Sequence, residues 1–499
     1  MNSIYRQVKH SSVAAIALTM LAAVTLLAGI AIPAQAQTLT PLYDFAGPQW
    51  LANPLGQLAL GRDGNFYGMT TGGSINEIYQ ITPDGTETTL WVSPDQYTYG
   101  TQCNYGLTLG PDGLLYGPCM DIDQSWSYGS GAIFRFDPSQ GQNGFTVIYE
   151  FPSYGCSVQP NALTLNTDGN FYGTTQGGNC GSAGLGTFFK ITPSGTLTTL
   201  HTFQGATEND AAYPSALTLG SDGNFYGTSQ AGGIGAQNLN SGTVFKITPK
   251  GKVTLLYVFN GNNNGPRDPA AVPTQGADGK WYGTTFLGGT YNGGTIFQLA
   301  GKKLNILHNF DQSVDNAAFP SFTLTLGTDG NFYSPSQDTY SGGYGPESIF
   351  KTTTIAKKPV YTDLFNWQLP EGGCTAGLVN GCFPSSPLAL HPNGNFYGTT
   401  QNGGYGSNDG GVFYSFNTGL EPYIILQFRR GTIGKSIGIF GVGLTGTTEV
   451  SFNGTSAEFT VVSDTYLTAT VPTGATTGYV TVTTNSGTLK SAVKLTVVK

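Results

Sequence analysis

The chain has 499 residues, of which 73 are Gly and 27 are Pro, while only 10% are charged and 12% are aromatic. This composition excludes charged, aromatic-poor disorder, and it excludes a helical bundle or coiled coil, which would need many Ala, Glu, Lys and Leu residues. The formal net charge of −8, with no basic stripe, argues against a nucleic-acid partner.

The N-terminal 36 residues have the pattern of a secretory signal peptide. Arg6 and Lys9 precede an apolar run at 13–32, and small residues follow at Ala34 and Ala36. We expect cleavage after Ala36, although an uncleaved transmembrane anchor is the alternative for a run of this length. The mature protein is then expected to have no membrane span and to be secreted or held at the cell surface, with the periplasm as the alternative location.

A hexapeptide close to D-G-N-F-Y-G recurs along most of the chain. Its copies start at Asp63, Asp112, Asp168, Asp222, Asp278, Asp329 and Asn393. An apolar stretch precedes each copy, and a Gly-rich loop, the pattern G-T-x-F-K-I-T-P-x-G and an alternating stretch follow the best-matching ones. Each repeat therefore predicts four strands, with an Asp-Gly turn between the first two and a Pro-x-Gly turn between the last two.

The repeat predicts an all-β fold. Phe and Tyr are adjacent in the hexapeptide, so they point to opposite faces of their strand, and both faces must be covered. A radial array of blades covers both faces, which indicates a seven-bladed β-propeller over residues 37–420. Residues 38–45 have the pattern of a fourth strand without its first three, so this N-terminal strand is expected to close the ring against the last repeat. A solenoid is the alternative, but it would need capping repeats.

These repeats resemble the Gloeo_Verruco (GloVer) tandem repeat of exported bacterial proteins. The resemblance spans residues 38–420 and departs most at Leu114 and Leu115 in the second copy and at Ser334 in the sixth. It implies secretion or surface display. It implies no catalytic residues, because the family has no settled activity.

Residues 421–499 have a different composition, rich in Thr and Val with alternating strands, and predict a small β-sandwich. The stretches at 438–444, 450–454, 469–472 and 478–482 resemble the immunoglobulin-like IPT/TIG domain. That resemblance implies a spacer or an interaction module of an extracellular protein.

The six cysteines are even in number, and an exported protein is expected to oxidise them to three disulfides. Reflection about the Asp-Gly turns places Cys156 nearly opposite Cys180, and Cys103 within three residues of the position opposite Cys119. Cys374 and Cys382 lie in one connection and form the third expected pair. No CxxC pair or Cys/His cluster indicates a metal site, and no cofactor is expected.

The long connections between the second and third strands, and between repeats, are the expected binding surface. They carry aromatic residues suited to a neutral ligand such as a glycan: Trp126, Tyr128, Tyr291, Tyr340, Tyr344 and Tyr405. His201, His308 and His391 are interpreted as structural, and no nucleophile elbow or phosphate loop is present.

The favoured interpretation is an exported, non-catalytic binding, adhesion or surface scaffold protein. Its expected partner is a glycan or a cell-envelope component. One alternative is a polysaccharide hydrolase or lyase with paired carboxylates in the central channel, since such acids would be distant in sequence. The other is a purely structural envelope component.

Overall fold

The computed structural model describes most of the chain from residue 37 onward. The described residues are 37–45, 53–72, 75–93, 103, 106–119, 131–152, 158–177, 184–233, 241–261, 265–269, 271–315, 317–336, 347–354, 359–367, 378–404 and 410–499. Residues Thr38–Lys499 belong to one compact unit. The expected signal peptide, 1–36, lies outside the described residues.

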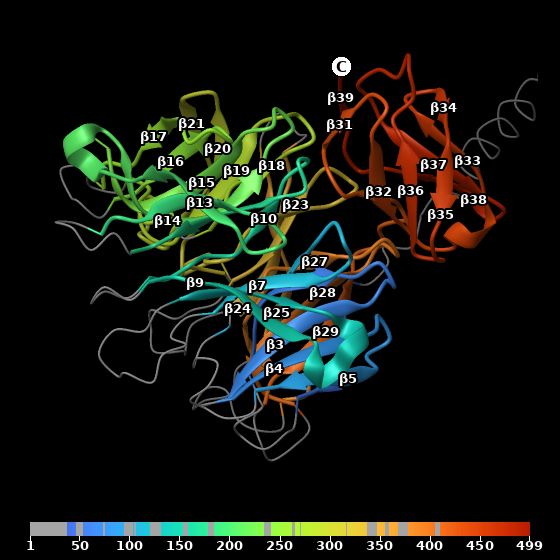
Figure 1. Ribbon diagram of the computed structural model, residues 1–499. Coiled ribbons are helices and arrows are strands. Elements are labelled where there is room, and N and C mark those ends of the chain that lie inside the picture. The colour runs from blue at the N-terminus through green and yellow to red at the C-terminus, as the bar shows by residue number, and fades with distance from the viewer. Residues whose placement is uncertain are drawn as a thin grey trace, which may run out of the picture. The chain divides into compact units, whose positions relative to one another are not determined.

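Within the described residues, each of the first six repeats forms an antiparallel sheet whose four strands are hydrogen-bonded in chain order (Figure 1). The first sheet contains β2 (Pro54–Leu60), β3 (Phe66–Gly72), β4 (Ile75–Ile81) and β5 (Glu87–Val92). The second contains β6 (Thr108–Leu109), β7 (Leu115–Cys119), β8 (Ala132–Phe136) and β9 (Phe145–Glu150). The third contains β10 (Thr164–Leu165), β11 (Phe171–Thr175), β12 (Thr187–Ile191) and β13 (Leu197–Thr202).

The next three sheets repeat the same order. The fourth contains β14 (Ala211–Leu219), β15 (Phe225–Gly232), β16 (Thr243–Ile247) and β17 (Val253–Val258). The fifth contains β18 (Thr274–Gln275), β19 (Trp281–Thr285), β20 (Thr295–Ala300) and β21 (Lys303–Asn309). The sixth contains β22 (Thr325–Leu326), β23 (Phe332–Pro335), β24 (Glu347–Thr352) and β25 (Tyr361–Trp367). Two short 3-10 helices, η1 (Pro138–Asn143) and η2 (Gly205–Glu208), lie in connections.

The seventh sheet joins the two ends of the repeat region. The last repeat supplies β26 (Cys382–Pro384), β27 (Ala389–Leu390), β28 (Phe396–Asn402) and β29 (Val412–Asn417). The N-terminal strand β1 (Thr38–Asp44) pairs antiparallel with β29, with Leu39 opposite Phe416 and Asp44 opposite Val412. A ring closed by the N-terminal strand requires this pairing.

Buried side chains form one apolar cluster between each pair of consecutive sheets in the described chain. A further cluster joins the seventh sheet to the first, where Tyr397 and Phe413 pack with Leu58, Phe66 and Tyr79. Because each sheet is covered on both faces, its second strand is buried along its length, as in β11. These contacts explain the adjacent aromatic residues of the hexapeptide.

The Asp-Gly turn holds the tyrosine of its own hexapeptide. In the third repeat Gly169 has a φ of +78°, which glycine adopts without strain. The backbone N–H of Asn170 donates to Oδ1 of Asp168 at 3.1 Å, and the hydroxyl of Tyr172 donates to Oδ2 at 3.0 Å. Burial and the neighbouring Asp168 carboxylate raise the pKa of Tyr172 to about 12, so its hydroxyl stays protonated at neutral pH.

The same hydroxyl-to-carboxylate bond recurs in the first six repeats. In the seventh repeat Asn393 stands in place of Asp, and its amide donates to the Tyr397 hydroxyl at 2.9 Å. The carboxylate thus fixes a side chain as well as a turn, a role that the sequence analysis did not assign to it.

The tyrosine held in this way packs against the next sheet. In six of the seven repeats its ring meets the Phe or Trp of the following hexapeptide, with centroids 4.6 Å apart for Tyr172 and Phe225 and 3.8 Å for Tyr226 and Trp281. Tyr67 instead shares a cluster with Leu115 of the second copy. The last such contact joins Tyr397 to Phe66 of the first sheet, at 4.8 Å. The other pairs are Tyr116–Phe171, Tyr282–Phe332 and Tyr333–Phe396.

The glycine that ends the hexapeptide leaves room for an aromatic ring of the third strand. A Cβ at Gly173 would lie 2.6 Å from Cζ of Phe189, and one at Gly227 would lie 2.8 Å from Cζ of Phe245. Phe189 and Phe245 are fully buried, so they have little space to move away. A side chain at this position would therefore crowd the core between sheets.

Residues after 421 form two further four-stranded sheets around one core. The first contains β30 (Ile425–Leu426), β32 (Ser436–Phe440), β36 (Tyr466–Thr470) and β35 (Phe459–Val461). The second contains β34 (Thr455–Ala457), β33 (Thr447–Phe452), β37 (Val480–Thr484) and β38 (Gly487–Lys490), and β31 (Arg430–Thr432) pairs in parallel with β39 (Thr496–Val498). The 3-10 helix η3 (Leu444–Gly446) precedes β33. Ile439 and Leu467 of the first sheet meet Val450 and Val482 of the second.

Deleting residues 38–46 should lower the melting temperature sharply or cause aggregation. The deletion removes β1 and leaves the N–H and C=O groups along one edge of β29 without partners, and such an edge invites pairing with another chain. Thermal unfolding followed by circular dichroism, together with size-exclusion chromatography, measures both effects. A synthetic peptide of residues 38–46 added in trans should restore part of the stability, and a truncated protein that melts like its parent would contradict the pairing.

Tyr172→Phe and Tyr172→Ala should separate the hydroxyl bond from the ring contact. Loss of the hydroxyl should lower the free energy of unfolding by about 0.5–1.5 kcal/mol, and loss of the buried ring should lower it by about 3–5 kcal/mol. Urea unfolding measures both. Tyr291→Ala is the matched control, because Tyr291 is 57% exposed and its loss should change little. Equal losses for both Tyr172 variants would rule out a main role for the ring.

Candidate functional site

The first strands of the repeats are tied to one another by threonine hydroxyls. Thr108 donates to the carbonyl of Leu163 at 2.7 Å, and Thr164 donates to that of Leu217 at 2.6 Å. The corresponding bonds further on are Thr274 to Leu324 and Thr325 to Leu388. Each bond links one sheet to the next, so the first strands lie together and their hydroxyls are already satisfied.

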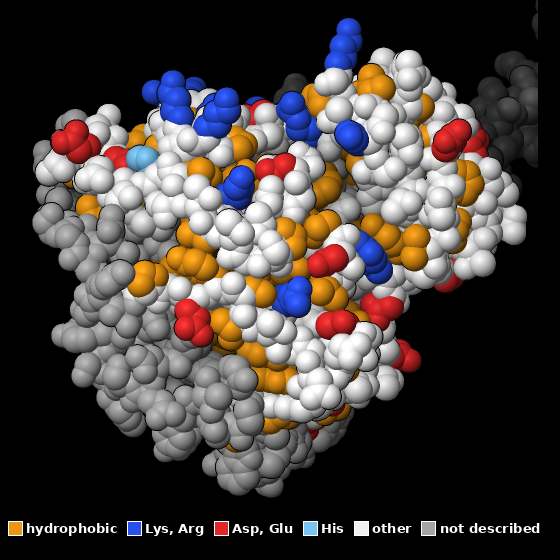
Figure 2. Space-filling view, viewed as in Figure 1, with side chains coloured by type: hydrophobic (Ala, Val, Ile, Leu, Met, Phe, Trp, Pro, Cys, Tyr) orange, Lys and Arg blue, Asp and Glu red, His pale blue; other side chains and the backbone are white. Residues whose placement is uncertain are grey.

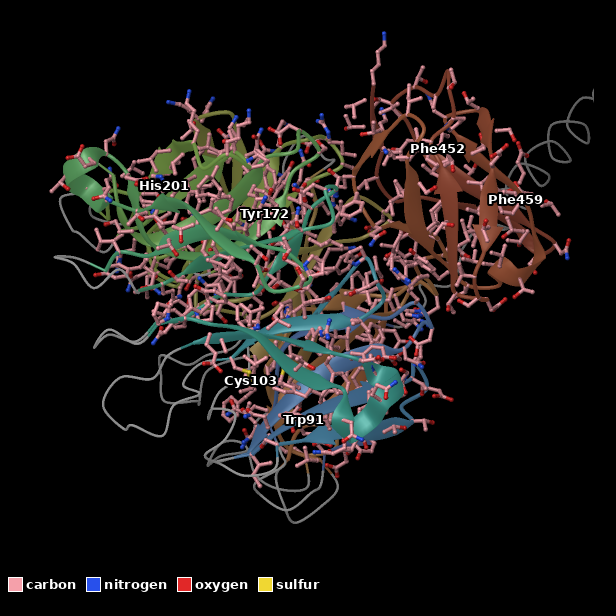
Figure 3. The ribbon with its side chains drawn as sticks, viewed as in Figure 1. Trp91, Cys103, Tyr172, His201, Phe452 and Phe459 are labelled. Carbon is pink, nitrogen blue, oxygen red and sulfur yellow. A yellow bond between two sulfur atoms is a disulfide. The ribbon has the colours of Figure 1, made fainter. Side chains whose placement is uncertain are left out.

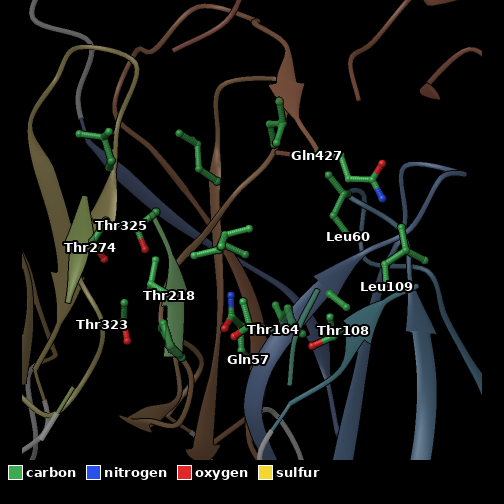
Figure 4. Close-up of a pocket in the computed structure, with 18 of the residues that line it drawn as sticks. Gln57, Leu60, Thr108, Leu109, Thr164, Thr218, Thr274, Thr323, Thr325 and Gln427 are labelled. Carbon is green, nitrogen blue, oxygen red and sulfur yellow. The ribbon is translucent and has the colours of Figure 1, made fainter. Parts of the chain in front are cut away.

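These strands surround a cavity of about 640 Å³. Figure 4 shows Thr108, Thr164 and Thr218 from the sheets, with Gln427 from the C-terminal segment. Leucines that end the first strands line much of it: Leu60, Leu109, Leu165, Leu219, Leu326 and Leu390. Among the described lining residues, Arg429 is the only one with a charged side chain, and none is a carboxylate.

The C-terminal segment contacts the repeat sheets at their Asp-Gly turns. The hydroxyls of Ser463 and Thr465 donate to the carbonyl of Arg62 at 3.0 Å and 2.7 Å, and the Arg62 guanidinium lies 5.0 Å from the centroid of the Tyr466 ring. Nη1 of Arg430 donates to the carbonyl of Asp222 in the fourth sheet at 3.2 Å. These contacts reach two turns on different sheets. The segment therefore covers part of the turn end, which is the end of the repeat sheets where the Asp-Gly turns lie.

Of the aromatic residues that were predicted to contact a ligand, only Tyr291 lies within the described chain. It is 57% exposed in the connection between β19 and β20, next to Asn292, whose Oδ1 accepts a hydrogen bond from Arg267. Tyr213 is 39% exposed with a φ of +54°, and the sequence analysis did not select it. The remaining predicted aromatics lie outside the described residues: Trp126, Tyr128, Tyr340, Tyr344 and Tyr405.

Cys103 and Cys119 form a disulfide, which is one of the three pairs expected from the sequence. Both side chains are buried in the cluster between the first and second sheets, which also contains Trp91 (Figure 3). Cys382 is also disulfide-bonded. Cys156, Cys180 and Cys374 lie outside the described residues, so the other two pairings stay predictions. A disulfide is typical of proteins from oxidising compartments.

Two of the three histidines in the described part of the chain pair with an aspartate that follows in the sequence. Nε2 of His201 lies 2.7 Å from Oδ2 of Asp210, and Nε2 of His308 lies 2.8 Å from Oδ2 of Asp315. Each aspartate also accepts a backbone N–H of the same connection, and each histidine packs edge-on against the Phe two residues later. The tyrosines at the equivalent positions make the same ring contact. These pairs therefore hold their connections in place. The two aspartates follow their histidines at different spacings, so the sequence pattern did not indicate them.

His391 joins the seventh sheet to the first. Its Nε2 donates to the carbonyl of Gly64 at 3.1 Å, and its Nδ1 accepts the backbone N–H of Asn393 at 3.1 Å. A carbonyl only accepts and an N–H only donates, so this ring is neutral. It is 3% exposed, and burial lowers its pKa below the ordinary value of 6.5.

The first sheet also contains a buried carboxyl group that was not predicted from the sequence. Glu77 of β4 is 7% exposed and accepts hydroxyl hydrogen bonds from Thr70, at 3.0 Å, and from Thr89. Burial raises its pKa. Thr187 and Thr295 hold the same strand position in other sheets and bond to a second-strand threonine. Glu77 therefore replaces a structural threonine within the sheet.

No described helix is long and apolar enough to span a bilayer. No three His, Cys, Asp or Glu side chains in the described chain are grouped as metal ligands would be.

The chain matches the model of the Gloeobacter/Verrucomicrobia repeat twice, over residues 122–265 and 234–462. The two matches together cover more than half of the chain. The protein therefore belongs to the Gloeobacter/Verrucomicrobia repeat family. A search of curated proteins gave no match.

Several solved structures are similar to the chain at low identity. A streptogramin B lyase is 16% identical, with 77% of this chain and 98% of that chain covered and a TM-score of 0.48. An oligogalacturonate lyase from Vibrio parahaemolyticus is 12% identical, with 77% and 97% covered and a TM-score of 0.46. A PQQ-bound aldose sugar dehydrogenase from Streptomyces coelicolor is 14% identical, with 77% and 99% covered and a TM-score of 0.38. At these scores the likenesses carry no functional conclusion for this chain.

His391 should make the stability fall as the pH drops. Its folded pKa lies below the ordinary value of 6.5, so below that pH the unfolded chain takes up a proton that the folded chain does not. The stability is present above pH 6.5 and is lost as the pH falls toward the folded pKa. Chemical unfolding of the protein and of His391→Gln at several pH values between about 5 and 8 measures this. The variant should show a shallower decline, and parallel profiles would contradict the assignment.

Proposed function

We propose that the seven repeat sheets form a closed seven-bladed β-propeller over residues 37–420, followed by an immunoglobulin-like domain of the IPT/TIG type at 421–499. The pairing of β1 with β29 and the cluster that joins the seventh sheet to the first support closure. The two-sheet core after residue 421 supports the second domain.

The protein is exported, in this proposal, and remains at the cell surface or outside the cell. The N-terminal apolar segment with its small residues supports export. The disulfide between Cys103 and Cys119 supports an oxidising compartment.

The function that we assign is non-catalytic recognition by the loop end of the propeller. The single observation behind it is the difference between the two ends of the sheets. In an antiparallel sheet the first and third turns lie at one end, and the connections from the second to the third strand lie at the other. The turn end is uniform, locked by Asp–Tyr bonds and contacted by the C-terminal domain. The loop end carries the long and variable connections, which suit binding on a rigid scaffold.

A neutral polysaccharide is the proposed ligand class. Exposed tyrosine offers a flat apolar face with a polar hydroxyl, and Tyr291 presents one at the loop end. Figure 2 shows charged side chains of both signs scattered over the face in view, among larger areas of uncharged atoms, and only 10% of the residues of the chain are charged.

The enzyme alternative is a polysaccharide hydrolase or lyase acting in the channel. It needs carboxylates that face the substrate, whereas the described lining of the cavity offers leucines, threonines and Arg429. A purely structural envelope role is the other alternative. It requires that no glycan bind.

Glycan-array binding of the purified protein, followed by titration of the best polysaccharide, tests the recognition role. Tyr291→Ala should weaken binding up to about tenfold, the range of one aromatic contact. Val462→Ala is the matched control, because Val462 is 58% exposed in the C-terminal domain and should not affect binding. A negative array would favour the structural role. Release of new reducing or unsaturated ends from the polysaccharide would favour the enzyme.

A further inference from the structure

The central cavity contains a cationic side chain without an ionic partner. Arg429 lies between β30 and β31, and its backbone carbonyl accepts the N–H of Thr496, which anchors it to the C-terminal core. Its side chain lines the cavity, and Nη1 donates to the carbonyl of Gln275 at 2.6 Å. Among the described residues no carboxylate forms an ion pair with it; the ion pairs there involve His201, Lys280 and His308.

Arg429 is partly buried. A charge that is removed in part from water is costly unless it has a partner. Burial lowers the pKa of Arg429 to about 10, which leaves the guanidinium protonated at neutral pH. A guanidinium has five N–H donors in a planar fork that matches a carboxylate. The Gln275 carbonyl uses one of them, so the side chain retains capacity for an anion.

The rest of the cavity wall is uncharged and largely apolar. The leucines that end the first strands supply apolar surface, and Thr108, Thr164, Thr274 and Thr325 already donate to neighbouring carbonyls. Gln57 and Gln427 are among the few other polar side chains (Figure 4). The volume of about 640 Å³ lies within the range of roughly 300–1,000 Å³ typical of small-molecule sites.

We propose that this cavity binds a small carboxylate with an apolar body, such as a medium-chain fatty acid. The carboxylate would pair with Arg429, and the hydrocarbon would lie against the leucines of the first strands. The site lies at the turn end, under the C-terminal domain, and so is distinct from the glycan surface proposed above.

Isothermal titration of the purified protein with decanoate and with decan-1-ol tests the proposal, because the two probes share a chain and differ in charge. Decanoate should bind more tightly than the alcohol. Arg429→Gln should weaken decanoate binding by about tenfold to a hundredfold, the range of one charge-assisted hydrogen bond, and should leave the alcohol unaffected. Arg429→Lys should retain most of the preference.

Two further variants test whether a loss of binding comes indirectly from a weaker contact between the C-terminal domain and the repeat sheets. Arg430→Gln removes the neighbouring positive charge and its bond to Asp222, outside the cavity, and should bind decanoate like the parent. Thr218→Phe fills part of the cavity and should weaken both probes. Equal affinity for the two probes, equal losses in Arg429→Gln and Arg430→Gln, or no binding of decanoate to the parent protein would each overturn the proposal.

Discussion

The contact between one hexapeptide tyrosine and the aromatic ring of the next hexapeptide is the interaction on which the repeat region depends. It joins sheets that share no strand, and in the first six repeats the Asp-Gly turn holds the tyrosine in position for it. Three constraints of the motif then follow together: an acid to hold the hydroxyl, adjacent rings to reach both neighbours, and a glycine to leave space for Phe189 and its equivalents. The aspartate, the two aromatic residues and the final glycine thus all support the packing between sheets, directly or within their own sheet.

The two ends of the repeat sheets differ in the contacts that they make. At the turn end, backbone carbonyls that the turns expose are taken up by Ser463, Thr465 and Arg430. Contacts of this kind need the uniform geometry that the Asp-Gly turns provide. The opposite connections are free of that requirement, so they can vary in length and composition without disturbing the packing between sheets.

Much of the fold could be predicted from the sequence, because the signals were local and repeated. The spacing of the hexapeptides predicted the four-stranded sheets, and the unmatched strand at 38–45 predicted the partner of β29. The candidate site was harder to predict. Asp210 pairs with His201 across a connection, and Arg429 of the C-terminal segment bonds to Gln275 of the fifth repeat. No regular spacing in the sequence relates these residues. Glu77 stands at a strand position that holds threonine in other repeats, so the repeat pattern gave no sign of a buried acid there.

The pairing of β1 with β29 joins the first residues of the repeat region to nearly its last. During synthesis β1 is therefore made before the other strands of the repeat region, and it has no partner until β29 has been made. Such a long-range contact is slow to form and leaves intermediates exposed to aggregation.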